Sequence, residues 1–331
     1  MTHIFPPERR GLAFGLQTTV AGLFMASGPL IGGAFSELLS WRYIFLLNLP
    51  LIAAIAVIVL AAWMPALSER HRAEGGARFD AAGLLTLIVG VSAFTIALMQ
   101  GVDWGWLTAP SLSLLAVGLA GLAAFAIVET RRTAPLIDLA LLRIGPFTAG
   151  VLVFAAFQWD KIVVFVFVPL FLQSAGFSPI EAGLPIVIAV LPATLTSALT
   201  GTIADRFGTR RVILAGVALN GAMVLLFALA ALLKAMPLLY GALFVWGAGL
   251  PFISVVPRRA LMSAVPVAQQ GEASGVNLTI QMMGGTLGLA VASALLAATG
   301  SYAAVFLATG LVVLVMVLVV AALVRPPAAS G

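Results

Sequence analysis

Gly201-Thr202-Ile203-Ala204-Asp205-Arg206-Phe207-Gly208-Thr209-Arg210-Arg211 is the stretch of this sequence that decides the fold. It places one acid, three arginines and two glycines between two apolar runs, at 180–200 and 211–233. Each run is near the ~20 residues that, at a rise of ~1.5 Å per residue, cross a hydrocarbon core ~30 Å thick. We therefore expect the short loop between the runs to lie at a membrane face.

Composition extends this expectation to the whole chain. Of the 331 residues, 62% are hydrophobic and 9% are charged, against roughly 25% charged residues in soluble domains. The net charge of +5 does not indicate a nucleic-acid partner, because the basic residues form no stripe or cluster typical of one. There is no cysteine, and the only histidines are His3 and His71, so we expect no metal, no cofactor and no enzymatic activity.

Charged and Pro/Gly-rich breaks divide the chain into ten apolar runs, each long enough to span a bilayer. Backbone groups in lipid must be satisfied within the segment, so the runs are expected to be helices rather than strands. The predicted fold is an all-α, polytopic membrane bundle of ten transmembrane helices. The runs lie at 12–36, 43–63, 81–100, 111–129, 147–172, 180–200, 211–233, 238–257, 273–298 and 302–323.

Basic residues set the predicted orientation. Only Arg42 and Lys234 fall in the connections on one side, and Lys161 lies inside a run. The positive-inside rule makes the other side cytoplasmic and places both termini there, in a multi-pass protein of the plasma or inner membrane. That side holds fourteen arginines: Arg9, Arg10, Arg70, Arg72, Arg78, Arg131, Arg132, Arg143, Arg206, Arg210, Arg211, Arg258, Arg259 and Arg325.

The spacing of the opening stretch, Gly-x-x-x-Asp-Arg-x-Gly-x-Arg-Arg, resembles the signature loop of the major facilitator superfamily of secondary transporters. The resemblance implies that a tight glycine turn joins two helices, that Asp205 caps a helix start, and that arginines reach the carbonyl ends of neighbouring helices. The residues that carry it are Gly201, Asp205, Arg206, Gly208, Arg210 and Arg211.

Two earlier motifs narrow the resemblance to the fourteen-helix drug:proton antiporters. Residues 40–50, Ser-Trp-Arg-Tyr-Ile-Phe-Leu-Leu-Asn-Leu-Pro, resemble the entry to that group's sixth helix. The preceding run resembles the antiporter motif of the fifth helix, although Phe24 stands where the family often has glycine. The matching motif positions are Gly15, Gly28, Pro29, Gly32 and Gly33.

This resemblance implies three parts. Residues 1–63 would be a two-helix remnant of the N-terminal bundle, 64–146 a cytoplasmic connector with two extra helices and a linker, and 147–331 the C-terminal six-helix bundle. The chain would then correspond to helices five through fourteen and lack the first four. Because alternating access needs two bundles, we expect it not to transport alone unless the missing helices are supplied, for example by another chain.

Polar side chains inside two runs are the candidate substrate or proton sites. Gln158, Asp160 and Lys161 lie near the middle of one run, where an ionisable residue costs at least ~2.5–3.5 kcal/mol. Asp160 either titrates or attracts a cation in a central cavity, with Lys161 pairing to it or to another helix, or the two form a structural ion pair. Asn277 and Gln281 share a helix face and bind either substrate or a neighbouring helix.

The function implied is a proton-coupled exporter of hydrophobic or cationic small molecules, of the multidrug efflux type, in which a proton and the substrate compete. Its partners would be the substrate, protons and the bilayer. Two alternatives remain: a non-transporting fragment or subunit, and a metabolite-specific permease of the same superfamily.

Overall fold

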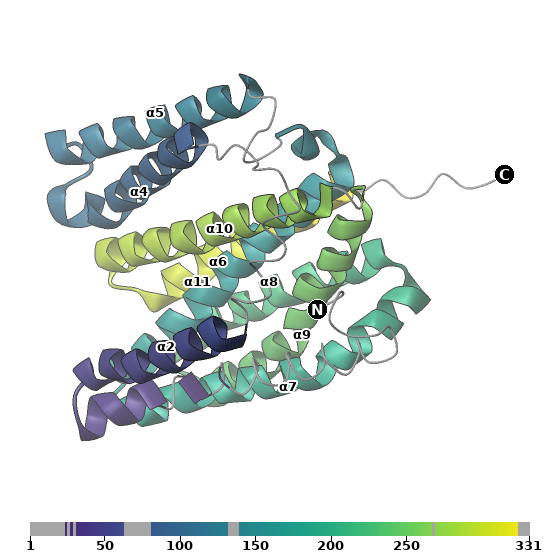
Figure 1. Cartoon of the computed structure of the whole chain (residues 1–331). Helices are drawn as coiled ribbons and strands as arrows, with labels where there is room; N and C mark the ends of the chain where they lie inside the picture. Colours follow the sequence, from purple (N-terminus) through teal and green to yellow (C-terminus); the bar gives the residue numbers. More distant parts are fainter. Residues whose placement is uncertain are drawn as a thin grey trace.

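The structure, a computed structural model, describes residues 24, 27–28, 31–62, 81–131, 139–266 and 269–323, and most of them are helical (Figure 1). No strand occurs within these ranges. After a helical stretch at 31–38, the elements are α2 (Arg42–Ala62), α4 (Ala81–Trp104), α5 (Ala109–Arg131), a 3-10 turn η1 (Leu139–Arg143), α6 (Gly145–Ser174), α7 (Pro179–Phe207), α8 (Thr209–Leu233), α9 (Met236–Ser263), α10 (Gln270–Thr299) and α11 (Tyr302–Leu323).

In the described part of the chain, nine helices are long and apolar enough to cross a membrane, with mean hydropathies from 1.6 to 3.0. They match nine of the ten predicted runs. Most of the remaining run, 12–36, lies outside the described residues. The prediction of an all-α, multi-pass membrane bundle is confirmed. A helix pairs its backbone N–H and C=O groups within the span, as a lipid environment requires.

The last six helices, α6 to α11, pack around one core. Helix α6 lies against α7, α9, α10 and α11, while α8 packs on α9 and α11. Large side chains without solvent contact fill the spaces between them, among them Trp246, Phe167, Phe227 and Phe306. The division of the chain into three parts, with residues 147–331 as a C-terminal six-helix bundle, stays a prediction.

Helices α4 and α5 form an antiparallel pair that lies beside α10 (Figure 1). Their backbones approach closely, since a Cβ on Gly90 or Gly118 would lie within 3.0 Å of backbone atoms of the other helix. Small residues at such crossings are typical of membrane helix pairs. Helix α2 differs, because none of its most apolar stretch is buried.

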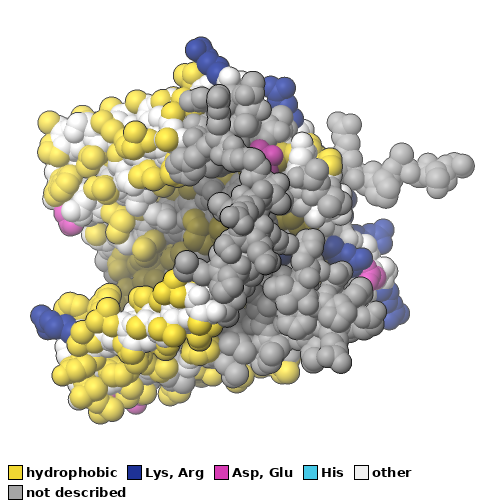
Figure 2. Space-filling view, viewed as in Figure 1, with side chains coloured by type: hydrophobic (Ala, Val, Ile, Leu, Met, Phe, Trp, Pro, Cys, Tyr) yellow, Lys and Arg dark blue, Asp and Glu magenta, His cyan; other side chains and the backbone are white. Residues whose placement is uncertain are grey.

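The basic residues lie mainly at one end of the helices. Figure 2 shows most of the visible Lys and Arg side chains gathered at one end of the bundle, with hydrophobic side chains over the lengths of the helices. Chain direction explains the pattern: Arg143 precedes α6, Arg206 ends α7, and Lys234 follows α8 at the opposite end. The view also shows a hollow between the α4 side and the α2 side, lined where visible by hydrophobic side chains.

Candidate functional site

Asp160 is the acid placed deepest in the membrane-spanning core. It lies near the middle of the 30-residue helix α6 and is 0% exposed. Its Oδ2 accepts a hydrogen bond of 2.9 Å from the indole Nε1 of Trp246 on α9, which is also fully buried. Its Oδ1 has no hydrogen-bond partner among the described residues. The carboxyl therefore joins α6 to α9 through one neutral donor.

Lys161 does not neutralise that carboxyl. No ion pair links it to Asp160 in the described ranges; instead its Nζ lies 5.3 Å from the centroid of the Phe157 ring, one turn earlier on α6. Adjacent residues on a helix point about 100° apart, which explains the separation. The predicted alternative in which Asp160 and Lys161 form a structural ion pair is therefore wrong for this structure.

Two amides meet at the contact between α6 and α10, and a third lies one turn away on α10. Gln281 donates from Nε2 to Oε1 of Gln158 at 3.4 Å, and both side chains are buried. Asn277, one turn before Gln281, is buried as well, and its Oδ1 has no partner among the described residues. The helices come close here because Gly284 and Gly285 of α10 face Ala155 and Gln158 of α6. The structure thus places Gln158 and Gln281 between the two helices.

The predicted loop at 201–211 is much shorter than expected. Helix α7 continues to Phe207, so Gly201, Asp205 and Arg206 are helical, and Gly208 alone separates α7 from α8. Asp205 lies in the last turn of α7 and caps no helix start, which makes the predicted capping role wrong. The N-cap of α8 is Gly208, and no side chain caps it.

Two arginines nevertheless tie this segment to neighbouring helices. Asp205 Oδ1 accepts from Arg259 Nη1 of α9 at 2.8 Å, with both side chains largely exposed. Arg210 Nη2 donates to the carbonyl oxygen of Ala321 near the end of α11 at 3.1 Å. The prediction that an arginine of this segment reaches a helix carbonyl end is confirmed for Arg210. Among the described residues, Arg206 and Arg211 donate no hydrogen bond to a helix carbonyl oxygen.

Gly208 is the position where this segment needs glycine. Its φ of 87° and ψ of 133° lie where a residue with a Cβ is strained. We expect Gly208→Ala to lower the free energy of unfolding by about 1–3 kcal/mol, measured by thermal unfolding in detergent. Gly201→Ala is the matched control, since a Cβ there meets nothing within 4 Å; equal losses in both variants would contradict this account of the turn.

The antiporter-motif residues are only partly described. Gly15 and Pro29 lie outside the described residues. A Cβ on Gly33 would lie 2.8 Å from the carbonyl oxygen of Pro179, so this glycine permits close contact with the start of α7, whereas Gly28 and Gly32 have open space around them. Glu37 follows on the same stretch and accepts from the Ile180 N–H at 3.4 Å.

Sequence reasoning missed Trp246, the partner of Asp160. It lies 86 positions away on another helix, and nothing in its local sequence distinguishes it from the other apolar residues of α9. Its ring also contacts Phe165 and Phe227, with centroids 6.3 Å away in each case. Asp160 is thereby linked to an aromatic group that spans α6, α8 and α9.

Comparison with known proteins supports the interpretation of the fold. The sequence profile of the Major Facilitator Superfamily matches residues 1–159 and 147–331. Among curated relatives, "Multidrug resistance protein Stp" of Mycobacterium tuberculosis is 29% identical over 89% of this chain and 54% of its own length. "Cephamycin export protein CmcT" of Amycolatopsis lactamdurans is 33% identical over 88% of this chain and 60% of its own length.

A third relative is similar over the same extent. "Tetracenomycin C resistance and export protein" of Streptomyces glaucescens is 27% identical over 88% of this chain and 54% of its own length. The chain therefore spans about half the length of the curated relatives that it matches.

Proposed function

Because the chain belongs to the major facilitator superfamily, we propose that it acts in the export of small molecules across a membrane. The chain is similar over most of its length to relatives whose names refer to resistance or export. Their names support outward transport as the proposed direction. We propose that the arginine-rich end of the helices is cytoplasmic, as the positive-inside rule requires, and that both termini lie on that side.

Asp160 is the observation that carries the proposal of proton coupling. When this buried carboxyl is ionised, it carries a negative charge that no described residue pairs with. When it is protonated, the charge is gone and one of its two oxygens carries a hydroxyl hydrogen. A change of protonation therefore changes the contact with Trp246 and so the contact between α6 and α9. Buried acids in membrane helices are typical of proton relays and substrate pathways.

The substrates proposed are hydrophobic or cationic. The hydrophobic lining visible in the hollow of Figure 2 supports binding of apolar molecules. A cation would compete with the proton for the negative charge of Asp160, which is one physical route to exchange. The positive charge of Lys161 would repel a cation that approaches the face of α6 on which Lys161 lies. Hydrophobic molecules without net charge are therefore the first substrates to test.

Everted membrane vesicles test the proposal. We expect vesicles that contain the chain, produced together with the part of the Mycobacterium relative that it does not match, to accumulate a hydrophobic dye when a pH gradient, acid inside, is imposed. They should lose the dye when a protonophore collapses the gradient. Vesicles without the chain are the control. Equal dye uptake with and without the gradient would contradict proton coupling.

The alternative, a fragment or subunit that needs further helices, rests on the coverage of the relatives. This chain matches only 54% of the Mycobacterium relative, and alternating access requires two bundles. Dye uptake that appears only when the unmatched part of that relative is produced alongside the chain would favour this alternative. For the metabolite-specific permease, counterflow that is confined to one substrate class would be the distinguishing result.

A further inference from the structure

Lys161 is the basic side chain that the described part of the chain places deepest in a membrane span. It lies near the middle of the 30-residue helix α6 and is half-buried. No ion pair joins it to a described residue, and its Nζ lies over the Phe157 ring, 5.3 Å from the centroid. A cation–π contact offsets only part of the cost of a charge at this depth. The charge of Lys161 therefore remains available to a ligand.

The face of α6 that carries Lys161 differs from the face that carries Asp160. Phe157 lies one turn before Lys161 and Phe165 one turn after it, so the three side chains share a face. All three are partly exposed, whereas Asp160 is fully buried and bonded to Trp246 of α9. This face of α6 thus presents one positive charge between two aromatic rings, and the carboxyl of Asp160 is turned away from it.

A row of cations and rings links Lys161 to the arginine-rich end of the helices. The rings of Phe157 and Phe154 meet edge to face, with their centroids 6.5 Å apart. The guanidinium carbon of Arg258 on α9 lies 5.6 Å from the centroid of Phe154. Arg258 is exposed and lies near the end of α9. An anion is therefore attracted first to Arg258 at the surface and then to Lys161 at membrane depth.

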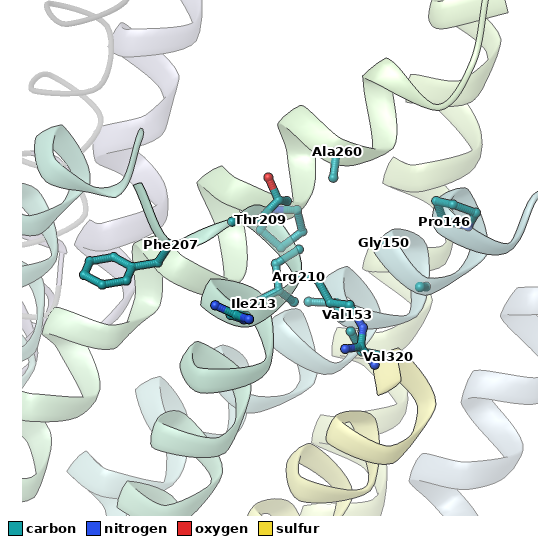
Figure 3. Close-up of a pocket in the computed structure, with 13 residues that line it drawn as sticks. Pro146, Gly150, Val153, Phe207, Thr209, Arg210, Ile213, Ala260 and Val320 are labelled. Carbon is teal, nitrogen blue, oxygen red and sulfur yellow. The ribbon is translucent and has the colours of Figure 1, made fainter. Parts of the chain in front are cut away.

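This row is separate from the cavity shown in Figure 3. That cavity, of about 590 Å³, lies at the arginine-rich end of the helices, and Val153 is the residue of α6 that lines it at the greatest depth. Lys161 follows Val153 by about two turns, ~12 Å along the helix axis. Phe154 and Phe157 do not line the cavity either. A ligand of Lys161 would thus lie deeper in the membrane than this cavity.

A second cavity lies beyond Lys161, toward the opposite end of α6. It has a volume of about 380 Å³, and its lining includes Phe165, Pro169 and Ile44 but no charged residue. Glu37 lies close to it in sequence, and its carboxylate accepts from the Ile180 N–H. The volume falls within the ~300–1,000 Å³ of small-molecule pockets. The apolar part of a ligand therefore has a place one helical turn from Lys161.

We propose that Lys161 binds the carboxylate of a hydrophobic organic acid, whose apolar part packs against Phe157 and Phe165. An ammonium group on a flexible stem forms charge-assisted hydrogen bonds with a carboxylate. A small inorganic anion would leave both rings without contacts, so the ligand carries an apolar part as well as a charge. This inference rests on the proposed export function and adds hydrophobic acids to its substrate class.

Binding to the purified full chain in detergent, without a pH gradient, tests the proposal. The probes are 1-pyrenebutyrate and its methyl ester, which share an apolar part and differ in charge. Energy transfer from tryptophan to pyrene reports binding, because the ring of Trp246 lies 6.3 Å from that of Phe165. The saturable part of the signal separates binding to the protein from partition into micelles. We expect the acid to bind about 10- to 100-fold more tightly than the ester.

Variants of Lys161 identify the charge responsible. Lys161→Gln is expected to lower the affinity for the acid about 10- to 100-fold, to that for the ester, and to leave ester binding unchanged. Lys161→Arg keeps the charge and should retain most of the affinity for the acid. A purely structural role of Lys161 would not change the two probes differently. The matched control is Lys234→Gln, which removes the same charge at the exposed C-cap of α8 and should bind both probes as the original protein does.

Equal affinities of the original protein for the acid and the ester would overturn the proposal. Unchanged acid binding in Lys161→Gln, or an equal loss in Lys234→Gln, would do the same. Should Lys161→Gln fail to fold, the two probes on the original protein and on Lys161→Arg decide the question.

The proposed export function fails by a different result. Absence of gradient-driven dye uptake would refute export. Absence of a preference for the acid, in a preparation that takes up the hydrophobic dye, would refute only the binding of acids at Lys161.

Discussion

Asp160→Asn is expected to reduce pH-gradient-driven dye accumulation to the level of vesicles without the chain, while the protein stays folded. Asparagine keeps the size of the side chain and an oxygen that can accept from Trp246, but it cannot release a proton. Asp160 is fully buried and forms no ion pair with a described residue. Loss of its charge should therefore leave no basic side chain without a partner. The measurement is uptake in whichever preparation transports, together with thermal unfolding of the same protein.

Two variants give this prediction its controls. Asp103→Asn removes a carboxylate at the exposed end of α4 and should leave uptake unchanged. Trp246→Phe keeps an aromatic ring but removes the donor to Asp160, so it should alter the pH dependence of uptake more than its maximum. Full gradient-driven uptake by Asp160→Asn would remove this residue from the mechanism.

Gly247→Ala is expected to lower the free energy of unfolding by about 1–3 kcal/mol, the usual cost of overpacking. Gly247 of α9 faces α7, and a Cβ there would overlap the backbone of Ala189, with the Ala189 Cα at 2.8 Å. Backbone atoms cannot move aside as the end of a flexible side chain can, so the two helices must separate. Thermal unfolding in detergent measures the loss.

Gly241→Ala, on the same helix, is the matched control. A Cβ at Gly241 meets nothing within 4 Å, and alanine favours a helix over glycine by ~1 kcal/mol. We expect this variant to be as stable as the original protein or slightly more stable. If both substitutions were tolerated equally, the close packing of α7 on α9 would be refuted.

The sequence predicted the membrane spans well because lipid leaves the backbone little choice. The run at 302–323 is α11 (Tyr302–Leu323), and the run at 211–233 begins two residues late, since α8 starts at Thr209. The prediction of a loop over 201–211 was wrong for a related reason. Polar residues mark the membrane face, but a helix can continue into that region, and α7 does so through Asp205 and Arg206.

The candidate site was less predictable. Hydropathy identifies Asp160 as an acid at membrane depth, yet its hydrogen-bond partner depends on how α6 packs against α9. Local spacing carries no such information, which is why Trp246 was missed and why the pairing of Asp160 with Lys161 was left open. The contact of Arg258 with Phe154 likewise depends on the packing of α9 against α6.

Substrate-induced proton release tests the central claim, that a buried carboxyl in α6 exchanges its proton when the carrier binds substrate. The measurement adds a transported dye to purified protein in weakly buffered detergent solution with a pH indicator. We predict that dye binding releases a proton from the original protein and none from Asp160→Asn, although both bind the dye. Equal release from the two proteins, or dye binding to the original protein without any release, would contradict the account.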